Sequence, residues 1–227
     1  MDSDTEKAGA VGIHVGEIVG EPDKKGNSDR VGYFTESLLE DLNNLSPAQL
    51  AQKWGQKLAA LESERYEDPA TGLKVKEAGK ILLQREIDIA RQNGKDLALV
   101  LIDLDGFKQI NDTQGHAAGD EAIQILANYL EHQTSRETIA CRFGGDEFFL
   151  IMPGSPKESA LGFSRRTLRE LPGQMRAKGF NTTPSIGVSL FRSDTKDSES
   201  MMREADEALY TAKEKGKNRV EVFGAEG

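Results

Sequence analysis

The spacing of hydrophobic residues predicts a folded domain that begins near residue 67 of this 227-residue chain. A helix is predicted over residues 76–92, and its apolar side consists of Ala78, Ile81, Leu82 and Ile89. Residues 97–102 are an unbroken apolar run of strand length, which is typical of a central strand buried on both faces.

The same patterns predict the remaining elements of the domain. Helices are expected over residues 119–132, 160–171 and 200–215, and strands over 138–143, 148–152, 183–191 and 220–223. The short Gly-rich connection between the second and third strands predicts a hairpin. The order α-β-α-β-β-α-β-α-β favours an α+β domain with a mostly antiparallel central sheet and helices on its faces.

The segment before this domain divides into two parts. Residues 1–31 are rich in Gly and charge, and we expect a flexible tail. Residues 32–66 predict two helices, the second with an apolar stripe of Leu50, Trp54, Leu58 and Leu61. The stripe could pack against the domain itself or against the same helix of a second subunit, in which case the segment would drive dimerisation. Residues 68–73 contain Pro and Gly, so we place the start of a domain of residues 67–227 here.

Composition narrows the class of protein. The formal net charge is -9, which argues against binding a nucleic-acid backbone, because phosphate contacts need clustered positive charge. No apolar run is long enough to span a bilayer, and the acidic N-terminus does not look like a signal peptide. The single cysteine, Cys141, cannot form an intramolecular disulfide, so we expect a cytoplasmic protein. Its apolar neighbours favour a core thiol over a nucleophile.

Three acids stand where strands end. Asp103 follows the buried strand, and Asp146 and Glu147 lie at the tip of the hairpin. If the strands are neighbours, these carboxylates meet at one edge of the sheet, where they repel one another unless a cation neutralises them. Mg²⁺ prefers such oxygen ligands together with substrate phosphates. Gly144 and Gly145 would let a triphosphate lie close to the backbone. The alternative is an ordinary Gly-Gly turn with solvated acids.

Two further pairs suit a nucleotide, and each has a structural alternative. Lys213 and Lys217 are four residues apart near a helix end, where they could clamp phosphates or compensate the helix dipole. Asn111 and Asp120 flank a Gly-rich loop, and an Asp can accept two hydrogen bonds from the edge of guanine. The alternative for Asp120 is N-capping of the helix that follows Gly119.

Together these blocks resemble the GGDEF-domain diguanylate cyclases over roughly residues 66–223. The blocks that carry the resemblance are residues 101–112 (LIDLDGFKQIND), Gly115-His116, Gly119-Asp120, residues 142–148 (RFGGDEF), residues 185–188 (SIGV) and residues 205–218 (ADEALYTAKEKGKN). The resemblance implies the palm-like nucleotidyl-cyclase fold and the condensation of two GTP into cyclic di-GMP and two pyrophosphates. It also implies a homodimer, at least a transient one, because each domain holds one GTP.

The resemblance assigns roles to single residues. Asp103, the Leu104 carbonyl, Asp146 and Glu147 would bind Mg²⁺, which Mn²⁺ could replace, and Glu147 could instead assist deprotonation of the attacking hydroxyl. Asn111 and Asp120 would read guanine. The phosphates would meet Phe107, Lys108, Gly144, Gly145, Lys213 and Lys217.

The sequence departs from the family pattern at four places. The Arg-x-x-Asp product-inhibition motif would fall on Ser135 and Thr138, which cannot replace it, so we expect no feedback through that site. Gly106 stands where a bulky residue is common, Val75-Lys76 replaces the usual Asn-Arg, and Lys217 replaces the commoner Arg. A catalytically silent GTP-binding module is the alternative function, although the acids of the hairpin are all present.

Overall fold

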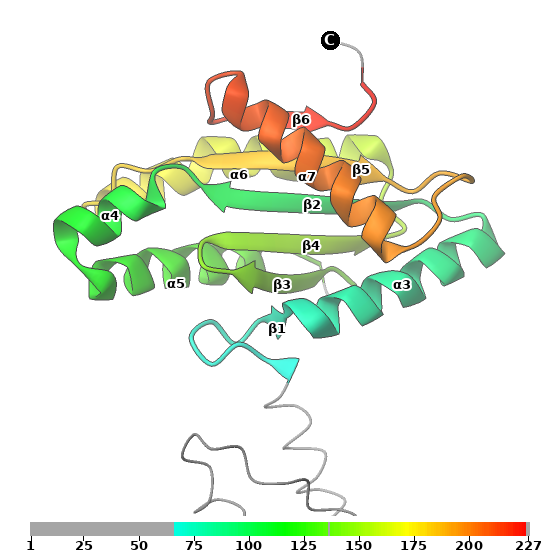
Figure 1. Cartoon of the computed structure of the whole chain (residues 1–227), viewed down its shortest axis with the longest axis horizontal. Helices are drawn as coiled ribbons and strands as arrows, with labels where there is room; N and C mark the ends of the chain where they lie inside the picture. The colour runs from blue at the N-terminus through cyan, green and yellow to red at the C-terminus, as the bar shows by residue number, and fades with distance from the viewer. Residues whose placement is uncertain (1–65, 136, 226–227) are drawn as a thin grey trace, which may run out of the picture. The chain divides into compact units, whose positions relative to one another are not determined.

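A computed structural model describes residues 66–135 and 137–225 of the chain. The predictions for the tail of residues 1–31 and for helices within residues 32–65 lie outside the described residues. Within them the chain forms the following elements (Figure 1): β1 Lys74–Val75, α3 Lys76–Asn93, β2 Leu97–Leu104, α4 Phe107–Gln114, α5 His116–Gln133, β3 Ile139–Gly144, β4 Glu147–Pro153, α6 Lys157–Ala177, β5 Pro184–Leu190, α7 Ser198–Glu214 and β6 Val220–Val222.

The described strands form one sheet in the order β1-β3-β4-β2-β5-β6. The pairs β3–β4, β2–β4 and β2–β5 are antiparallel, and the two pairs at the sheet edges, β1–β3 and β5–β6, are parallel. The predicted α+β fold with a mostly antiparallel sheet is therefore confirmed.

The central strand β2 is buried on both faces, as its apolar run predicts. Ala98, Val100 and Ile102 point into one layer of the core, which they share with α5 and α6. Leu99 and Leu101 point into the other layer, which they share with α3 and α7. In Figure 1, α3 and α7 lie in front of the sheet and α6 lies behind it. β2 is thus held by the core on both sides, and its end is a rigid platform for Asp103.

The sequence patterns did not predict β1 and α4, and they predicted α5 and α6 too short. β1 has only two residues, which is too few for an alternation of apolar and polar residues to be recognised. α4 buries only Ile110, so it carries no apolar stripe. α5 begins at His116, three residues earlier than predicted. α6 runs from Lys157 to Ala177, and it continues through the buried Pro172, where a helix end is normally expected.

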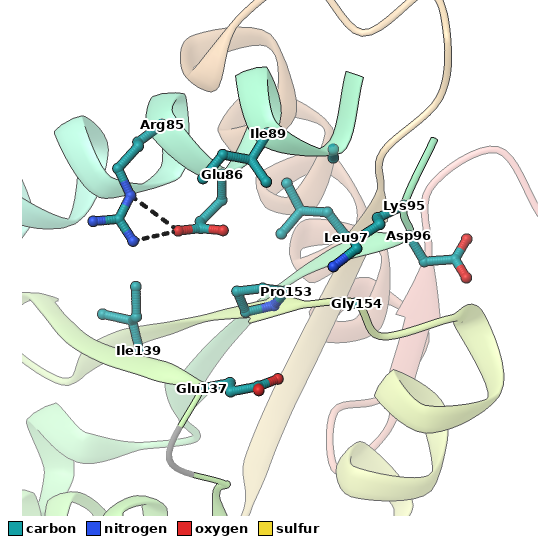
Figure 2. Close-up of a pocket in the computed structure, with 11 residues that line it drawn as sticks. Arg85, Glu86, Ile89, Lys95, Asp96, Leu97, Glu137, Ile139, Pro153 and Gly154 are labelled. Carbon is teal, nitrogen blue, oxygen red and sulfur yellow. Dashed lines mark hydrogen bonds and ion pairs between the residues drawn. The ribbon is translucent and has the colours of Figure 1, made fainter. Parts of the chain in front are cut away.

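The predicted apolar side of α3 was half right: Ala78 is buried and Leu82 packs partly buried against the core, but Ile81 and Ile89 do not face it. Ile81 is 64% exposed and Ile89 37% exposed, whereas the buried residues include Leu83, Ile87 and the charged Glu86. Arg85 makes this possible because its guanidinium donates two hydrogen bonds to Glu86, at 2.6 and 3.1 Å. Figure 2 shows this pair beside Ile89, at the wall of a pocket of about 440 Å³ that also borders the first residue of β2.

The single cysteine belongs to the core. Cys141 in β3 is fully buried, and burial raises the pKa of its thiol to about 12. A thiol in this state is not a nucleophile at neutral pH, which agrees with the core-thiol interpretation.

α7 packs directly onto the backbone of β5. A Cβ atom at Gly187 would overlap the Ala205 carbonyl oxygen and the backbone of Leu209. Only glycine lets the helix come this close, and the close approach fixes the end of α7 relative to the centre of the sheet. The lysine in the last turn of α7 is thereby placed near the end of β2.

Candidate active site

The three predicted acids come together at one end of the sheet. Asp103, near the end of β2, lies opposite Glu147, the first residue of β4, in the antiparallel register. Asp146 precedes Glu147 in the turn between β3 and β4. This is the left end of the sheet in Figure 1, where β2 ends and the hairpin turns. The two strands are neighbours, which is the condition under which the acids were expected to meet. Asp103 is only 7% exposed, and Asp146 and Glu147 are partly buried, so the alternative of a plain turn with solvated acids does not fit.

Lys213 forms an ion pair with Asp103. Its ammonium nitrogen lies 2.7 Å from Asp103 Oδ2. Lys213 also stands in the last turn of α7, so the dipole interpretation holds as well. The phosphate-binding and the dipole interpretations of Lys213 are compatible, because the same helix end that the lysine compensates also directs its side chain toward Asp103.

Burial and mutual repulsion keep these acids hard to ionise. The pKa of Asp103 is raised to about 6: burial is the main cause, the Lys213 ammonium works in the opposite direction, and the charges of Asp146 and Glu147 add to the rise. Burial likewise raises the pKa values of Asp146 and Glu147 above their usual range. A positive charge added beside these carboxylates would stabilise their ionised form.

The turn that carries Asp146 is short and tightly held. Gly144 pairs with Glu147, so only Gly145 and Asp146 form the loop, which is shorter than predicted. Gly145 has φ 56°, a left-handed conformation that suits glycine. The Arg142 side chain donates to the Gly145 carbonyl from two of its nitrogens, at 2.8 and 3.2 Å.

Sequence reasoning missed a second contact of Arg142. Its guanidinium also reaches both carboxylate oxygens of Asp68, at 3.0 and 3.2 Å. Burial works to raise the pKa of Asp68, but hydrogen bonds from Thr71 and Arg142 outweigh it, so the pKa lies below its usual range. Arg142 belongs to a block that carries the resemblance and Asp68 does not, so the sequence patterns did not link these two residues, which are 74 positions apart.

The residues expected to read guanine lie on two packed helices. Asn111 is on α4 and Asp120 is on α5. A Cβ atom at Gly119 would overlap the Asn111 amide, so this glycine makes room for Asn111 next to Asp120. Because α5 begins at His116, Asp120 lies inside the helix, and the N-cap interpretation of Asp120 was wrong.

The residues expected near phosphates lie at two loops. Phe107 and Lys108 begin α4, directly after the end of β2. Lys217 follows α7 and is exposed, with φ 63°, and Asn218 has φ 47°. No hydrogen bond or ion pair of the Lys217 ammonium occurs within residues 66–135 and 137–225.

A divalent cation fits the chemistry of the acidic cluster, although the cluster is not a preformed cage. Within the described part of the chain, no three His, Cys, Asp or Glu residues form a group that could hold a metal by themselves. Mg²⁺ needs only one or two carboxylates, since water and substrate phosphates complete its shell. Asp103, together with Asp146 or Glu147, can supply these, and an ion on Asp103 would compete with Lys213 for Oδ2.

Two other regions, the pocket of Figure 2 and the positions of the product-inhibition motif, lie outside the acidic cluster. The pocket in Figure 2 borders Leu97, at the start of β2, so it lies at the opposite end of the strand from Asp103 and is not part of the acidic cluster. At the positions of the product-inhibition motif, the Ser135 and Thr138 hydroxyls hydrogen-bond to each other at 3.1 Å.

None of the described helices combines the length and the apolar character needed to cross a membrane.

Comparison with known proteins agrees with the fold and the site. Residues 65–219 match the family described as "Diguanylate cyclase, GGDEF domain". The chain is 32% identical over 190 residues to diguanylate cyclase DgcP of Pseudomonas aeruginosa, and 36% identical over 179 residues to the probable diguanylate cyclase DgcC of Escherichia coli. These matches cover 82% and 77% of this chain but 28% and 47% of the relatives, so the chain spans less than half the length of either.

A solved structure supports the same assignment. The GGDEF domain of DgcB from Caulobacter crescentus, in complex with cyclic di-GMP, superimposes with a TM-score of 0.64 at 28% identity, covering 71% of this chain and 94% of that one. With the acids, the hairpin and the helices in their places, the chain belongs to the GGDEF-domain family of diguanylate cyclases.

Proposed function

We propose that this chain is a diguanylate cyclase, which condenses two GTP into cyclic di-GMP and two pyrophosphates. The observation that carries the proposal is the pairing of Asp103 with Glu147 across β2 and β4, with Lys213 bound to Asp103. The relatives named as diguanylate cyclases support the same reaction.

In each half of the reaction, the 3′-oxygen of one GTP forms a bond to the α-phosphorus of the other. The bond between that phosphorus and the bridging oxygen breaks, and pyrophosphate leaves. Where Glu147 does not serve as a metal ligand, we propose that it accepts the proton of the attacking hydroxyl; its raised pKa supports this role, because it lies closer to neutral pH than that of an exposed carboxylate. Two such steps close the ring.

Asp103, Asp146, Glu147 and the Leu104 carbonyl would hold Mg²⁺, or Mn²⁺ in its place. When bound, the ion neutralises phosphate charge and favours ionisation of the attacking hydroxyl. Lys213 can leave Asp103 for a phosphate oxygen, so the positive charge stays at the site when a substrate arrives. This exchange is consistent with a half-exposed lysine beside a buried acid.

The base and the phosphates would be held by the flanking elements. Asn111 on α4 would supply an amide and Asp120 on α5 a carboxylate, which suits the N1 and 2-amino edge of guanine; the close approach of Asn111 to Gly119, the residue before Asp120, supports this assignment. Phe107 and Lys108 at the start of α4 would meet the phosphates, with Gly144 and Gly145 allowing close approach and Lys217 adding charge.

Each domain offers one nucleotide site, so we propose that two copies face each other in an at least transient homodimer. Residues 32–66 are the segment proposed to bring them together. The hydrogen-bonded Ser135 and Thr138 leave no Arg-x-x-Asp motif to bind product, so we propose that cyclic di-GMP does not inhibit through this site. The cytoplasmic location expected from the single cysteine is part of the same proposal.

The test is turnover of GTP by the full chain with Mg²⁺, measured as cyclic di-GMP across a dilution series. We expect specific activity to fall on dilution, since two copies must meet. Glu147→Gln should abolish product, and Glu131→Gln, on the exposed side of α5, should not. Calorimetry separates the alternatives, because GTP binding without product at high protein concentration would indicate a silent nucleotide-binding module.

A further inference from the structure

The second acid of the Asp103-Leu104-Asp105 run makes contacts different from those of the first. Asp105 Oδ1 accepts a hydrogen bond from the Ser185 hydroxyl at 2.7 Å. Its Oδ2 accepts one from the Thr183 hydroxyl at 2.6 Å and one from the backbone amide of Asn218 at 3.2 Å. Three protein donors therefore use this carboxylate, whereas the side-chain partner of Asp103 is a lysine ammonium.

The backbone of Asp105 is also engaged. Its amide donates to the Thr183 carbonyl at 2.7 Å, and its carbonyl accepts from the Thr182 hydroxyl at 2.8 Å. The residue thus joins three segments: the end of β2, the start of β5 and the turn between α7 and β6. We call this set of hydrogen bonds among Asp105, Thr182, Thr183, Ser185 and Asn218 the Asp105 clamp.

The turn held by the clamp would be costly without support. Lys217 and Asn218 are consecutive non-glycine residues with positive φ, 63° and 47°. Each left-handed residue of this kind is unfavourable on its own and persists when surrounding contacts hold it. The Asn218 amide bonded to Asp105 is such a contact, and it fixes the residue next to Lys217 at the end of β2 where the acids gather.

We infer that Asp105 is a positioning residue, which holds the Lys217–Asn218 turn beside the acidic cluster, and that it is not a metal ligand. The inference rests on the proposed function in two respects: the use of Lys217 as a phosphate contact, and the metal ion that Asp105 is inferred not to bind. Its geometric part depends on the described contacts alone.

Three readouts on the full chain test the inference, with Asp105→Ala as the main variant and Asp105→Asn as the conservative one. The asparagine can keep the clamp, because its carbonyl can accept from Thr183 and Asn218 while its amide donates to the Ser185 hydroxyl. In Asp105→Ala we expect the Asn218 amide to exchange with solvent about tenfold faster, as the loss of one hydrogen bond implies, with Val100 in β2 as the unchanged reference. In Asp105→Asn we expect exchange close to that of the wild type.

The metal and substrate readouts separate positioning from ligation. Mn²⁺ affinity, measured by electron paramagnetic resonance without nucleotide, should be within twofold of wild type in Asp105→Ala and clearly lower in Asp103→Ala. The KM for GTP should rise about tenfold in Asp105→Ala and recover in Asp105→Asn. A loss of Mn²⁺ affinity in Asp105→Ala equal to that of Asp103→Ala overturns the inference, and so does unchanged exchange at Asn218.

A milder variant keeps the test decisive if Asp105→Ala does not fold. Thr183→Val removes one hydroxyl from the clamp at nearly constant volume, and it should speed Asn218 exchange in the same direction by a smaller factor. No change in this variant would count against the clamp. If the wild-type chain neither binds nor converts GTP, the proposed function fails, while the exchange of Asn218 still decides whether the clamp exists.

Discussion

Arg142 and Asp68 are joined by an ion pair that ties the beginning of the domain to the β3–β4 hairpin. The guanidinium contacts both Asp68 oxygens and also the Gly145 carbonyl. Both side chains are largely shielded, with 15% and 19% exposure. One arginine therefore connects the segment that follows residues 32–66 with the turn that carries Asp146.

We predict that Arg142→Lys lowers both turnover and stability. Lysine keeps the charge but cannot contact a carboxylate and a carbonyl with separate planar nitrogens. We expect kcat to fall about tenfold or more, because small displacements of catalytic groups are costly, and the free energy of unfolding to fall by about 1–3 kcal/mol. Initial rates and urea unfolding would measure the two effects. Arg169→Lys, whose ion pair with Glu170 lies on the surface, is the control that should change neither.

The acidic cluster predicts an unusual dependence of stability on pH. The pKa of Asp103 is about 6 in the folded chain against 3.8 for an ordinary aspartate, so the folded state takes up a proton that the unfolded state does not between those values. In metal-free buffer, stability from this group should therefore be greatest below about pH 4 and be lost as pH rises to about 6. The raised pKa values of Asp146 and Glu147 act in the same direction.

Urea unfolding at pH 4.5, 5.5 and 7 in the presence of a chelator would show the effect. Asp103→Asn should flatten the slope and stabilise the metal-free protein at pH 7. An unchanged slope in Asp103→Asn would mean that Asp103 does not carry the raised pKa.

The start of α3 offers a stabilising substitution. Val75 occupies the N-cap position and makes no side-chain hydrogen bond to the helix. Asparagine is among the preferred N-cap residues because its side chain can accept from a free backbone amide of the first turn. We expect Val75→Asn to raise the free energy of unfolding by about 0.5–2 kcal/mol, read from thermal or urea unfolding. Val75→Ala, which adds no acceptor, is the matched comparison, and equal stability of the two variants would refute the capping argument.

A matched pair of glycines tests the close contact between α7 and β5. At Gly187 a methyl group would overlap backbone atoms of Ala205 and Leu209, which cannot move aside cheaply. Gly187→Ala should cost several kcal/mol, at the high end of single substitutions. At Gly162 in α6 the same methyl group meets nothing within 4 Å, so Gly162→Ala should stabilise the protein by about 1 kcal/mol through helix propensity. Thermal unfolding of the two variants should move in opposite directions.

The convergence of the acids could be predicted because it depends on local patterns. The apolar run of β2 and the Gly-Gly hairpin each locate the end of a strand, and one assumption, that the strands are neighbours, brings Asp103 and Glu147 together. The Asp68–Arg142 pair could not be found in this way, because the two residues are 74 positions apart and only the sheet brings them close. The Asp105 clamp was missed for the same reason.

The error on α3 has a different origin. Periodicity identifies the hydrophobic residues of a helix, but it does not say which of them face the sheet. Ile81 and Ile89 are exposed, while Glu86 is buried because Arg85 neutralises it. The packed face of α3 therefore contains a charged residue and its exposed face contains two isoleucines, so a rule that equates hydrophobic with buried gives the wrong face.

At Lys217, the residue type that best suits the left-handed backbone differs from the residue type that the proposed reaction uses. Backbone energetics favour glycine at φ 63°, so Lys217→Gly should relieve strain and yield a more robust fold. The same change would remove the ammonium group that the proposed function uses to bind phosphate. A search for thermostable variants would therefore drift toward glycine at this position and discard charge that the proposed reaction needs, whereas selection for turnover would keep the lysine at the expense of stability.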